Sequence, residues 1–245
     1  MASILGIDLA WRGGNNNSAV SVAQVSGERT IQITKVYSNI TIWQEIFENE
    51  IITKGTKGIA IDAPLIVNNI SGQRICEKLL SKEYSGRGAS CHSTNLTSYS
   101  NSDGVNLSNK LNDHGFAHLN CTGKFQIECY PHPALIEIFS LKYRLKYKKG
   151  NIIERQNRQG ILADRIMSLK QSNVVKLTLS EETKCLLRKD YIQSLQRRIE
   201  IKQNEDALDS IICAYIAGLF YFGCHSKVFG SITDGYIFVP KVRCI

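Results

Sequence analysis

Short apolar runs alternate with amphipathic stretches along this chain, the pattern of strands joined by helices. Residues 3–10 form an apolar run typical of a buried strand. Residues 18–26 and 30–38 alternate between apolar and polar side chains, as strands with one solvated face do. A Gly-rich and Asn-rich turn separates the first two strands, and Gly27 and Glu28 turn the chain before the third. The opening therefore predicts an antiparallel meander of three strands.

Helices separate the strands that follow the meander. A second apolar run, residues 57–62, stops at Ala63-Pro64, because proline cannot donate a hydrogen bond to a ladder. Strands separated by helices are expected to add to a sheet in parallel. The pattern predicts an α/β fold in which a mixed five-stranded sheet is flanked by helices. The other predicted elements are helices at 41–53, 72–82, 134–145 and 203–222, a strand at 124–130 and a terminal strand at 235–240.

Two segments depart from this pattern and are expected to be insertions into a single domain formed by the whole chain, residues 1–245. Residues 83–123 are rich in Ser, Asn, Gly and Thr, and they predict a long polar loop with a helix around 106–114. Residues 150–200 are basic and predict a helical insertion containing two helices, at 155–170 and 180–200.

The net charge of +8 is unevenly distributed. Between Lys142 and Arg198 stand fifteen Lys or Arg against five Asp or Glu, a local charge of +10, so the rest of the chain carries −2. A basic segment beside a slightly acidic body suggests a polyanionic partner such as nucleic acid. A solvated helical face explains the same composition equally well.

Composition also argues against several classes of protein. The hydrophobic content of 43% and charged content of 21% are ordinary for a globular protein. No apolar run reaches the roughly 18 residues of a membrane span, and the N-terminus does not resemble a signal peptide, so a cytoplasmic protein is expected. The eight cysteines form no Cys-x-x-Cys pair, which favours reduced thiols over a zinc site. Neither a phosphate-binding P-loop nor a Gly-x-Ser-x-Gly nucleophile motif occurs.

Carboxylates end three of the predicted strands. Asp8 and Asp62 each end an apolar run, and Glu128 stands near the end of a third. A single acid at a strand end is unremarkable, but a charge beside a sheet core needs compensation. If the three strands lie side by side, their carboxylates are expected to converge at one edge of the sheet.

The last helix adds two further acids. Asp206 and Asp209 are three residues apart, which places them on one helix face near its predicted start. Acids near a helix N-terminus are favoured by the helix dipole alone. Residues 211–222, however, are apolar all round, so this helix must be buried, and two acids that open a buried helix suggest metal ligands. Carboxylates suit Mg²⁺ or Mn²⁺, and such a group can hold two ions about 4 Å apart for phosphodiester cleavage.

Basic side chains near these acids are candidates for substrate contacts. Arg74 follows Asp62 and could bind a phosphate, although an ion pair with Glu77 on the same helix is the ordinary explanation. Where the basic segment starts, phosphate contacts are expected from Lys148, Lys149, Arg155 and Arg158.

Nearby rings allow two explanations each. Tyr143 and Tyr147 could stack on bases, but their spacing of four also fits side chains that face the core. His132, between two prolines, could transfer protons near neutral pH or could be structural.

These motifs together resemble an uncharacterised family, number 429 among the domains of unknown function, described as predicted nucleases with a ribonuclease H fold. The resemblance spans nearly the whole chain in order. The matching pieces are Gly6-Ile-Asp8-Leu-Ala-Trp11, Ile61-Asp62-Ala-Pro64-Leu, Arg74-Ile-Cys-Glu77, Glu128-Cys-Tyr-Pro131-His-Pro133-Ala, Glu205-Asp206-Ala-Leu-Asp209-Ser-Ile-Ile and Gly235-Tyr-Ile-Phe-Val-Pro240.

More distantly, the arrangement is similar to RuvC-type resolvases, whose acids stand on the first and fourth strands and as a pair opening the last helix. The resemblance implies a metal-dependent nuclease with a ribonuclease H-like fold, in which Asp8, Asp62, Asp206 and Asp209 occupy those positions and Glu128 is an additional acid. It implies Mg²⁺ or Mn²⁺ as cofactor and DNA or RNA as substrate. Two other functions stay open: a non-catalytic module that binds nucleic acid or protein, and an ATP-dependent phosphotransferase of the actin and sugar-kinase kind.

Overall fold

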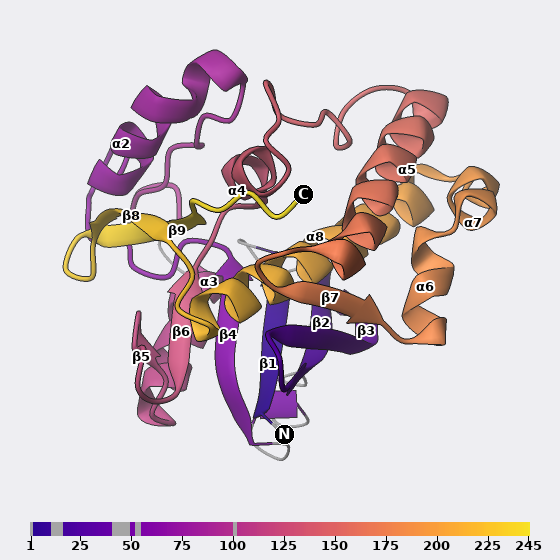
Figure 1. Cartoon of the computed structure of the whole chain (residues 1–245). Helices are drawn as coiled ribbons and strands as arrows, with labels where there is room; N and C mark the ends of the chain where they lie inside the picture. Colours follow the sequence, from indigo (N-terminus) through magenta and orange to yellow (C-terminus); the bar gives the residue numbers. More distant parts are fainter. Residues whose placement is uncertain (1, 11–16, 41–49, 52–54, 100–101) are drawn as a thin grey trace.

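A mixed sheet forms the centre of the protein (Figure 1). The computed structural model describes residues 2–10, 17–40, 50–51, 55–99 and 102–245. The meander is present as β1 (Ala2–Asp8), β2 (Ser18–Ser26) and β3 (Thr30–Ile40), paired antiparallel. Two further strands, β4 (Thr56–Asp62) and β6 (Phe125–Glu128), add in parallel beside β1. The α/β fold and the mixed sheet are therefore as predicted.

The sheet has seven strands among the described residues rather than five, in the order β5-β6-β4-β1-β2-β3-β7. The two-residue β5 (Ala117–His118) pairs with β6 inside the polar segment. On the opposite edge, β7 (Lys176–Leu179) pairs in parallel with β3. Its alternation is short, with only Leu177 and Leu179 buried, which is why the sequence did not reveal it. The basic segment therefore contributes a strand as well as helices.

The helices broadly follow the prediction, but three boundaries differ. The helix expected at 134–145 ends at Ile138, and the chain that follows it is irregular up to α5. The helix expected at 180–200 is broken at Arg188, whose extended backbone separates two short helices. The last helix begins at Arg198, before the apolar run, because Glu200 accepts a hydrogen bond from the Arg197 amide and caps the helix start. The described α-helices are α2 (Ile75–Tyr84), α3 (Asp103–Asp113), α4 (Pro131–Ile138), α5 (Ile152–Ser168), α6 (Glu181–Leu187), α7 (Lys189–Ser194) and α8 (Arg198–Tyr221). The helix expected at 41–53 lies outside the described residues except for positions 50 and 51.

Helix α8 covers one face of the sheet, together with α4 and α5 (Figure 1). Ile4 of β1 and Ala60 of β4 belong to the core on this face, whereas Ile7 and Ile61 pack with α3 on the other face. At Gly6 the helix approaches so closely that an added Cβ would lie 1.9 Å from a backbone nitrogen of α8. This contact fixes the distance between β1 and α8.

A separate hairpin, β8 (Ser226–Ser231) and β9 (Gly235–Pro240), packs beside α2. The predicted terminal strand is β9, and it is buried along its whole length. Lys227 of β8 lies 2.5 Å from the Glu83 carboxylate at the end of α2, which ties the hairpin to that helix. None of the helices in the described part of the chain has both the length and the apolar content to cross a membrane.

Candidate active site

Two aspartates stand side by side where β1 and β4 end. In the parallel pairing of these strands, Asp8 is directly opposite Asp62. Each follows an isoleucine that points to the α3 face, so alternation along the strand turns both aspartates toward α8. Asp62 is buried and Asp8 partly so. In Figure 1 both strands run upward, so their C-terminal ends lie at the upper edge of the sheet.

Helix α8 brings two more aspartates to the same edge. Asp206 and Asp209 are both buried, and Asp209 has no exposed surface at all. Because α8 begins at Arg198, the two residues lie in its third turn and beyond, not at its start as predicted. The macrodipole effect is confined to the first turn and does not account for acids at these positions. Asp8 and Asp206 lie close enough to influence each other's pKa, which joins the helix pair to the strand pair.

Two lysine side chains reach into this group of four aspartates. The Lys148 ammonium lies 2.7 Å from one Asp209 carboxylate oxygen, and the Tyr147 hydroxyl donates to the other at 2.6 Å. Lys202 pairs with Asp206 one helical turn later and with Glu205 at 3.0 Å. The negative charge of the cluster is therefore balanced from two directions.

Burial and mutual repulsion set the ionisation of the cluster. Desolvation raises the pKa of Asp8 and of Asp62 well above the ordinary value, and neighbouring aspartates raise both further, while Lys148 opposes the rise. Desolvation also raises the pKa of Asp206, against the nearby Lys202 ammonium. Burial disfavours the charge of Lys148, but Asp209, Asp8 and Asp62 outweigh it and raise its pKa. Additional positive charge stabilises the ionised form of buried carboxyls whose pKa is raised in this way.

Glu128 lines the same cavity as Asp8 and Asp62 but points to the other face of the sheet. In the pairing of β4 with β6, Glu128 is opposite Ile61, so its side chain is on the face away from Asp62. There the Arg74 guanidinium donates to both Glu128 oxygens, at 2.9 and 2.6 Å, and the Leu65 amide donates at 2.9 Å. The residue that lies opposite Asp62 is Cys129, and its amide donates a hydrogen bond to the Ile61 carbonyl. Glu128 therefore has its lone pairs occupied by protein donors rather than turned to the cluster.

Arg74 is held in the same buried ion pair. Its Nε donates to Glu77 at 2.8 Å, and its Nη1 also donates to the Ile66 carbonyl at 3.0 Å. Burial disfavours the guanidinium charge, but Glu128 beside it raises its pKa above the ordinary value. The side chain is only 2% exposed, and four of its five N–H groups donate to protein acceptors, although it also lines the cavity described below. Its predicted role as a phosphate ligand stays a prediction.

The other predicted substrate contacts are divided between the site and the surface of α5. Lys148 lies among the aspartates and Lys149 lines the cavity described below. Arg155 pairs with Glu205 at 2.9 Å, and Arg158 pairs with Glu154 at 3.2 Å and bonds the Lys149 carbonyl.

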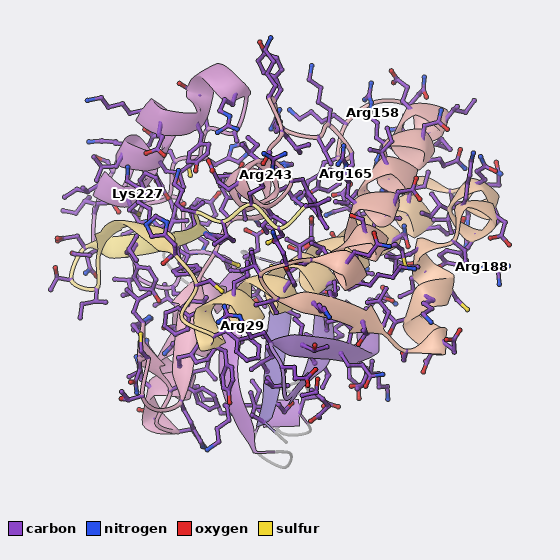
Figure 2. The ribbon with its side chains drawn as sticks, viewed as in Figure 1. Arg29, Arg158, Arg165, Arg188, Lys227 and Arg243 are labelled. Atoms are coloured by element: carbon purple, nitrogen blue, oxygen red, sulfur yellow. The ribbon has the colours of Figure 1, made fainter. Side chains whose placement is uncertain are left out.

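Basic side chains elsewhere are similarly dispersed. Figure 2 shows its labelled basic residues spread over several elements, with Arg158 and Arg165 both on α5. Arg188 pairs with Asp190. Lys184 likewise pairs with Glu181 at 2.5 Å and Arg197 with Glu200 at 2.7 Å. Much of the charge of the basic segment is thus neutralised locally.

A cavity of about 700 Å³ opens over Asp8 and Asp62. One wall is the segment between α4 and α5, and another is the turn after α2, which contributes Ser90, Cys91 and His92. His132 also lines the cavity, with a ring packed between Tyr130 and Tyr147 and a buried Nδ1 that has no hydrogen-bond partner. Burial and the Lys148 charge lower the pKa of His132 to about 3, so the imidazole is neutral near pH 7. This argues against proton transfer by His132 near neutral pH.

Sequence reasoning missed Lys202, and for Tyr147 it considered base stacking or core packing but not a bond to an aspartate. Lys202 is four residues before Asp206, a spacing that pairs charges on a helix, but it precedes the predicted helix start. Tyr147 is fully buried as expected, and its hydroxyl in addition binds Asp209, whereas Tyr143 is exposed.

The donor set suits a hard divalent cation, but the side chains do not yet enclose one. Asp209 has an oxygen with no aligned hydrogen bond, beside the Lys148 ammonium. Over the described ranges, no three His, Cys, Asp or Glu side chains are arranged to hold a metal ion. The two ammonium groups lie between the carboxylates instead. Asp8, Asp62, Asp206 and Asp209 are the residues that could hold Mg²⁺ or Mn²⁺ once those ammonium groups leave.

Comparison with known proteins gives a family but no activity. The model of a family described as proteins of unknown function, DUF429, matches residues 6–231, which is well over half of the chain. No curated protein and no solved structure matches the chain.

Proposed function

The chain belongs to the DUF429 family of proteins of unknown function, and from its site we propose a metal-dependent phosphodiesterase that cleaves nucleic acid. The fold we infer is ribonuclease H-like: a three-stranded meander, parallel strands beside β1, and a last helix that carries acids. The cofactor in this proposal is Mg²⁺ or Mn²⁺.

The observation that carries the proposal is the meeting of four aspartates from three elements in a desolvated cluster. Asp8 and Asp62 come from adjacent parallel strands, and Asp206 and Asp209 come from the helix packed across them. Concentrating four carboxyls costs free energy, as the raised pKa values of Asp8, Asp62 and Asp206 show, and such a cost is typical of a functional site.

The protein's own groups have defined tasks in this proposal. Asp8, Asp62, Asp206 and Asp209 would hold the metal, which when bound supplies an activated water and stabilises the leaving oxygen. Tyr147 fixes one Asp209 oxygen by a hydrogen bond of 2.6 Å. Lys148 and Lys202 supply positive charge to the carboxylates before a metal binds, and both side chains are partly exposed, so each has room to turn outward. The Arg74–Glu128 ion pair holds the end of β6 rather than the metal.

A non-catalytic binding module is the second candidate. The observation that favours it is the pairing of two ammonium groups with the aspartates, which leaves the cluster already compensated. In that case nucleic acid or protein would bind equally well with and without a divalent cation.

Hydrolysis of end-labelled DNA and RNA, single-stranded and duplex, tests the two candidates. Wild type is compared with Asp62→Asn in Mg²⁺, Mn²⁺ and EDTA, and Asp164→Asn on the exposed face of α5 is the matched control. We expect cleavage that needs the metal, is unchanged in the control, and falls at least about 100-fold in Asp62→Asn, since a metal contributes several kcal/mol to the barrier. Cleavage that persists in Asp62→Asn contradicts the assignment. Binding without cleavage in any metal favours the binding module.

A further inference from the structure

The cavity over the aspartates has the dimensions of a small-ligand site rather than of a groove for a duplex. Its volume of about 700 Å³ lies within the range of pockets that enclose a single small molecule. Its walls rise on several sides of Asp8 and Asp62: the turn after α2, the segment before α5, and Lys202 from α8. A continuous double helix is instead bound along an open surface through phosphates spaced over both strands.

One wall presents positive charge that the protein itself does not use. Arg144, Lys146 and Lys149 line the cavity from a single irregular segment. Among the described residues, none of these three side chains pairs with a carboxylate. Arg155, Arg158, Lys184 and Arg188 differ, because each of them pairs with a carboxylate. Three cations without a carboxylate partner are thus gathered on one wall of the cavity.

The wall near Arg144 also offers rings. Tyr130 and His132 line the cavity edge to face, with ring centroids 5.6 Å apart, and the Tyr130 hydroxyl donates to the Ser90 carbonyl on the opposite wall. His132 is 6% exposed, is neutral near pH 7, and keeps one buried ring nitrogen without a partner. Neutral rings beside fixed cations are the combination that recognises a base joined to a phosphate.

We propose that the cavity receives one nucleoside monophosphate unit, either the phosphorylated end of a single strand or a free nucleotide. The inference rests on the proposed function in taking nucleic acid as the ligand. The phosphate would contact Arg144, Lys146 and Lys149 above the aspartates, and the base would lie against Tyr130 and His132. A base-paired interior segment would be excluded because the walls admit one unit. The enzyme would therefore act on strand ends rather than within duplexes.

Equilibrium binding to the full chain tests this proposal, with Ca²⁺ in place of Mg²⁺ to prevent turnover. The probes are thymidine 5′-monophosphate, a single-stranded oligodeoxythymidylate with a terminal phosphate, the same strand closed into a circle, and a blunt-ended duplex of equal length. We expect the linear strand to bind at least about tenfold more tightly than the circle or the duplex, a difference of about 1.4 kcal/mol. The monophosphate should compete with the linear strand. If the monophosphate binds as tightly as the linear strand, the natural ligand is a free nucleotide. If it binds more weakly, the natural ligand is the end of a strand.

Variants link the preference to the cavity wall. Arg144→Gln and the exposed Lys146→Gln should each weaken binding of the linear strand by about tenfold. Arg165→Gln, an exposed residue of α5 that does not line the cavity (Figure 2), is the matched control and should leave binding unchanged. Equal binding of the circle or the duplex, or loss of affinity in the control alone, would overturn the proposal.

The outcome is separable from that of the proposed function. A preference for strand ends without hydrolysis in any metal would remove the catalytic activity and leave the ligand assignment standing. Metal-dependent cleavage within circles or duplexes would remove the ligand assignment and leave the catalytic activity standing.

Discussion

Replacing Arg74 by methionine should destabilise the protein strongly, because it leaves Glu128 as a buried carboxylate with one remaining donor, the Leu65 amide. Both partners of the pair are nearly inaccessible, with side chains 2% and 4% exposed. Breaking a buried ion pair from one side costs about 3–5 kcal/mol. For a domain of this size, such a loss lowers the melting temperature by about 6–20 °C.

Thermal and urea unfolding of four variants measure this effect: Arg74→Met, Glu128→Leu, the double variant, and Arg243→Met as an exposed control (Figure 2). The double variant removes both charges, so its loss of stability should be smaller than the sum of the single losses by at least about 1 kcal/mol. The control should change stability by less than about 0.5 kcal/mol.

The same pair decides whether Glu128 belongs to the metal site. Glu128→Gln should retain Mn²⁺ binding by calorimetry, whereas Asp62→Asn should lose it. The reasoning would be refuted if Arg74→Met unfolded like wild type, or if Glu128→Gln kept its stability and lost the metal.

Three further predictions concern the packing and charge around the aspartates. Gly6→Ala should cost at least about 3 kcal/mol in urea unfolding, since the new Cβ would lie 1.9 Å from α8, whereas Gly27→Ala, with open space around it, should be tolerated. Lys148→Met should lower the melting temperature in EDTA, because Asp209 loses its counter-ion, and saturating Mn²⁺ should restore most of the loss; an equal loss in both conditions would contradict the expected exchange. The lowered pKa of His132 means that the unfolded chain binds a proton below about pH 6.5 and the folded chain does not, so stability is lost as pH falls. Between about pH 7.5 and 5, the free energy of unfolding of His132→Phe should therefore fall by about 2 kcal/mol less than that of wild type.

Much of the sheet and half of the site were open to prediction because they depend on local patterns. Asp8 and Asp62 stand at the ends of two apolar strands, and the parallel pairing of these strands places the two aspartates opposite each other. The buried character of residues 211–220 likewise followed from their composition, and it placed Asp206 and Asp209 against the sheet.

The side of the sheet on which Glu128 lies was not open to prediction in the same way. Phe125 to Glu128 are all buried, so no alternation of polar and apolar residues marks a face. The face depends on a register in which Ile61, not Asp62, is opposite Glu128. A shift of one residue reverses every side chain of a strand, and only the pairing itself reveals it.

The place of Lys148 depends on a contact between distant parts of the chain. Its charge and its neighbours in sequence suggested a surface phosphate contact, but the segment before α5 folds back so that its ammonium meets Asp209. Composition carries no signal for such a contact. The early start of α8 was missed for a different reason: charged and apolar residues alternate in its first turn, so no continuous apolar run marks it, and Glu200 caps it.

The most direct test of the account is a crystal structure of the protein soaked in Mn²⁺, with anomalous diffraction used to locate the metal. The account predicts one or two peaks among Asp8, Asp62, Asp206 and Asp209, about 4 Å apart if there are two, with the Lys148 ammonium displaced from Asp209. Absence of a peak at these residues, with Lys148 still paired to Asp209 at saturating Mn²⁺, would contradict the central claim that the cluster is a metal site.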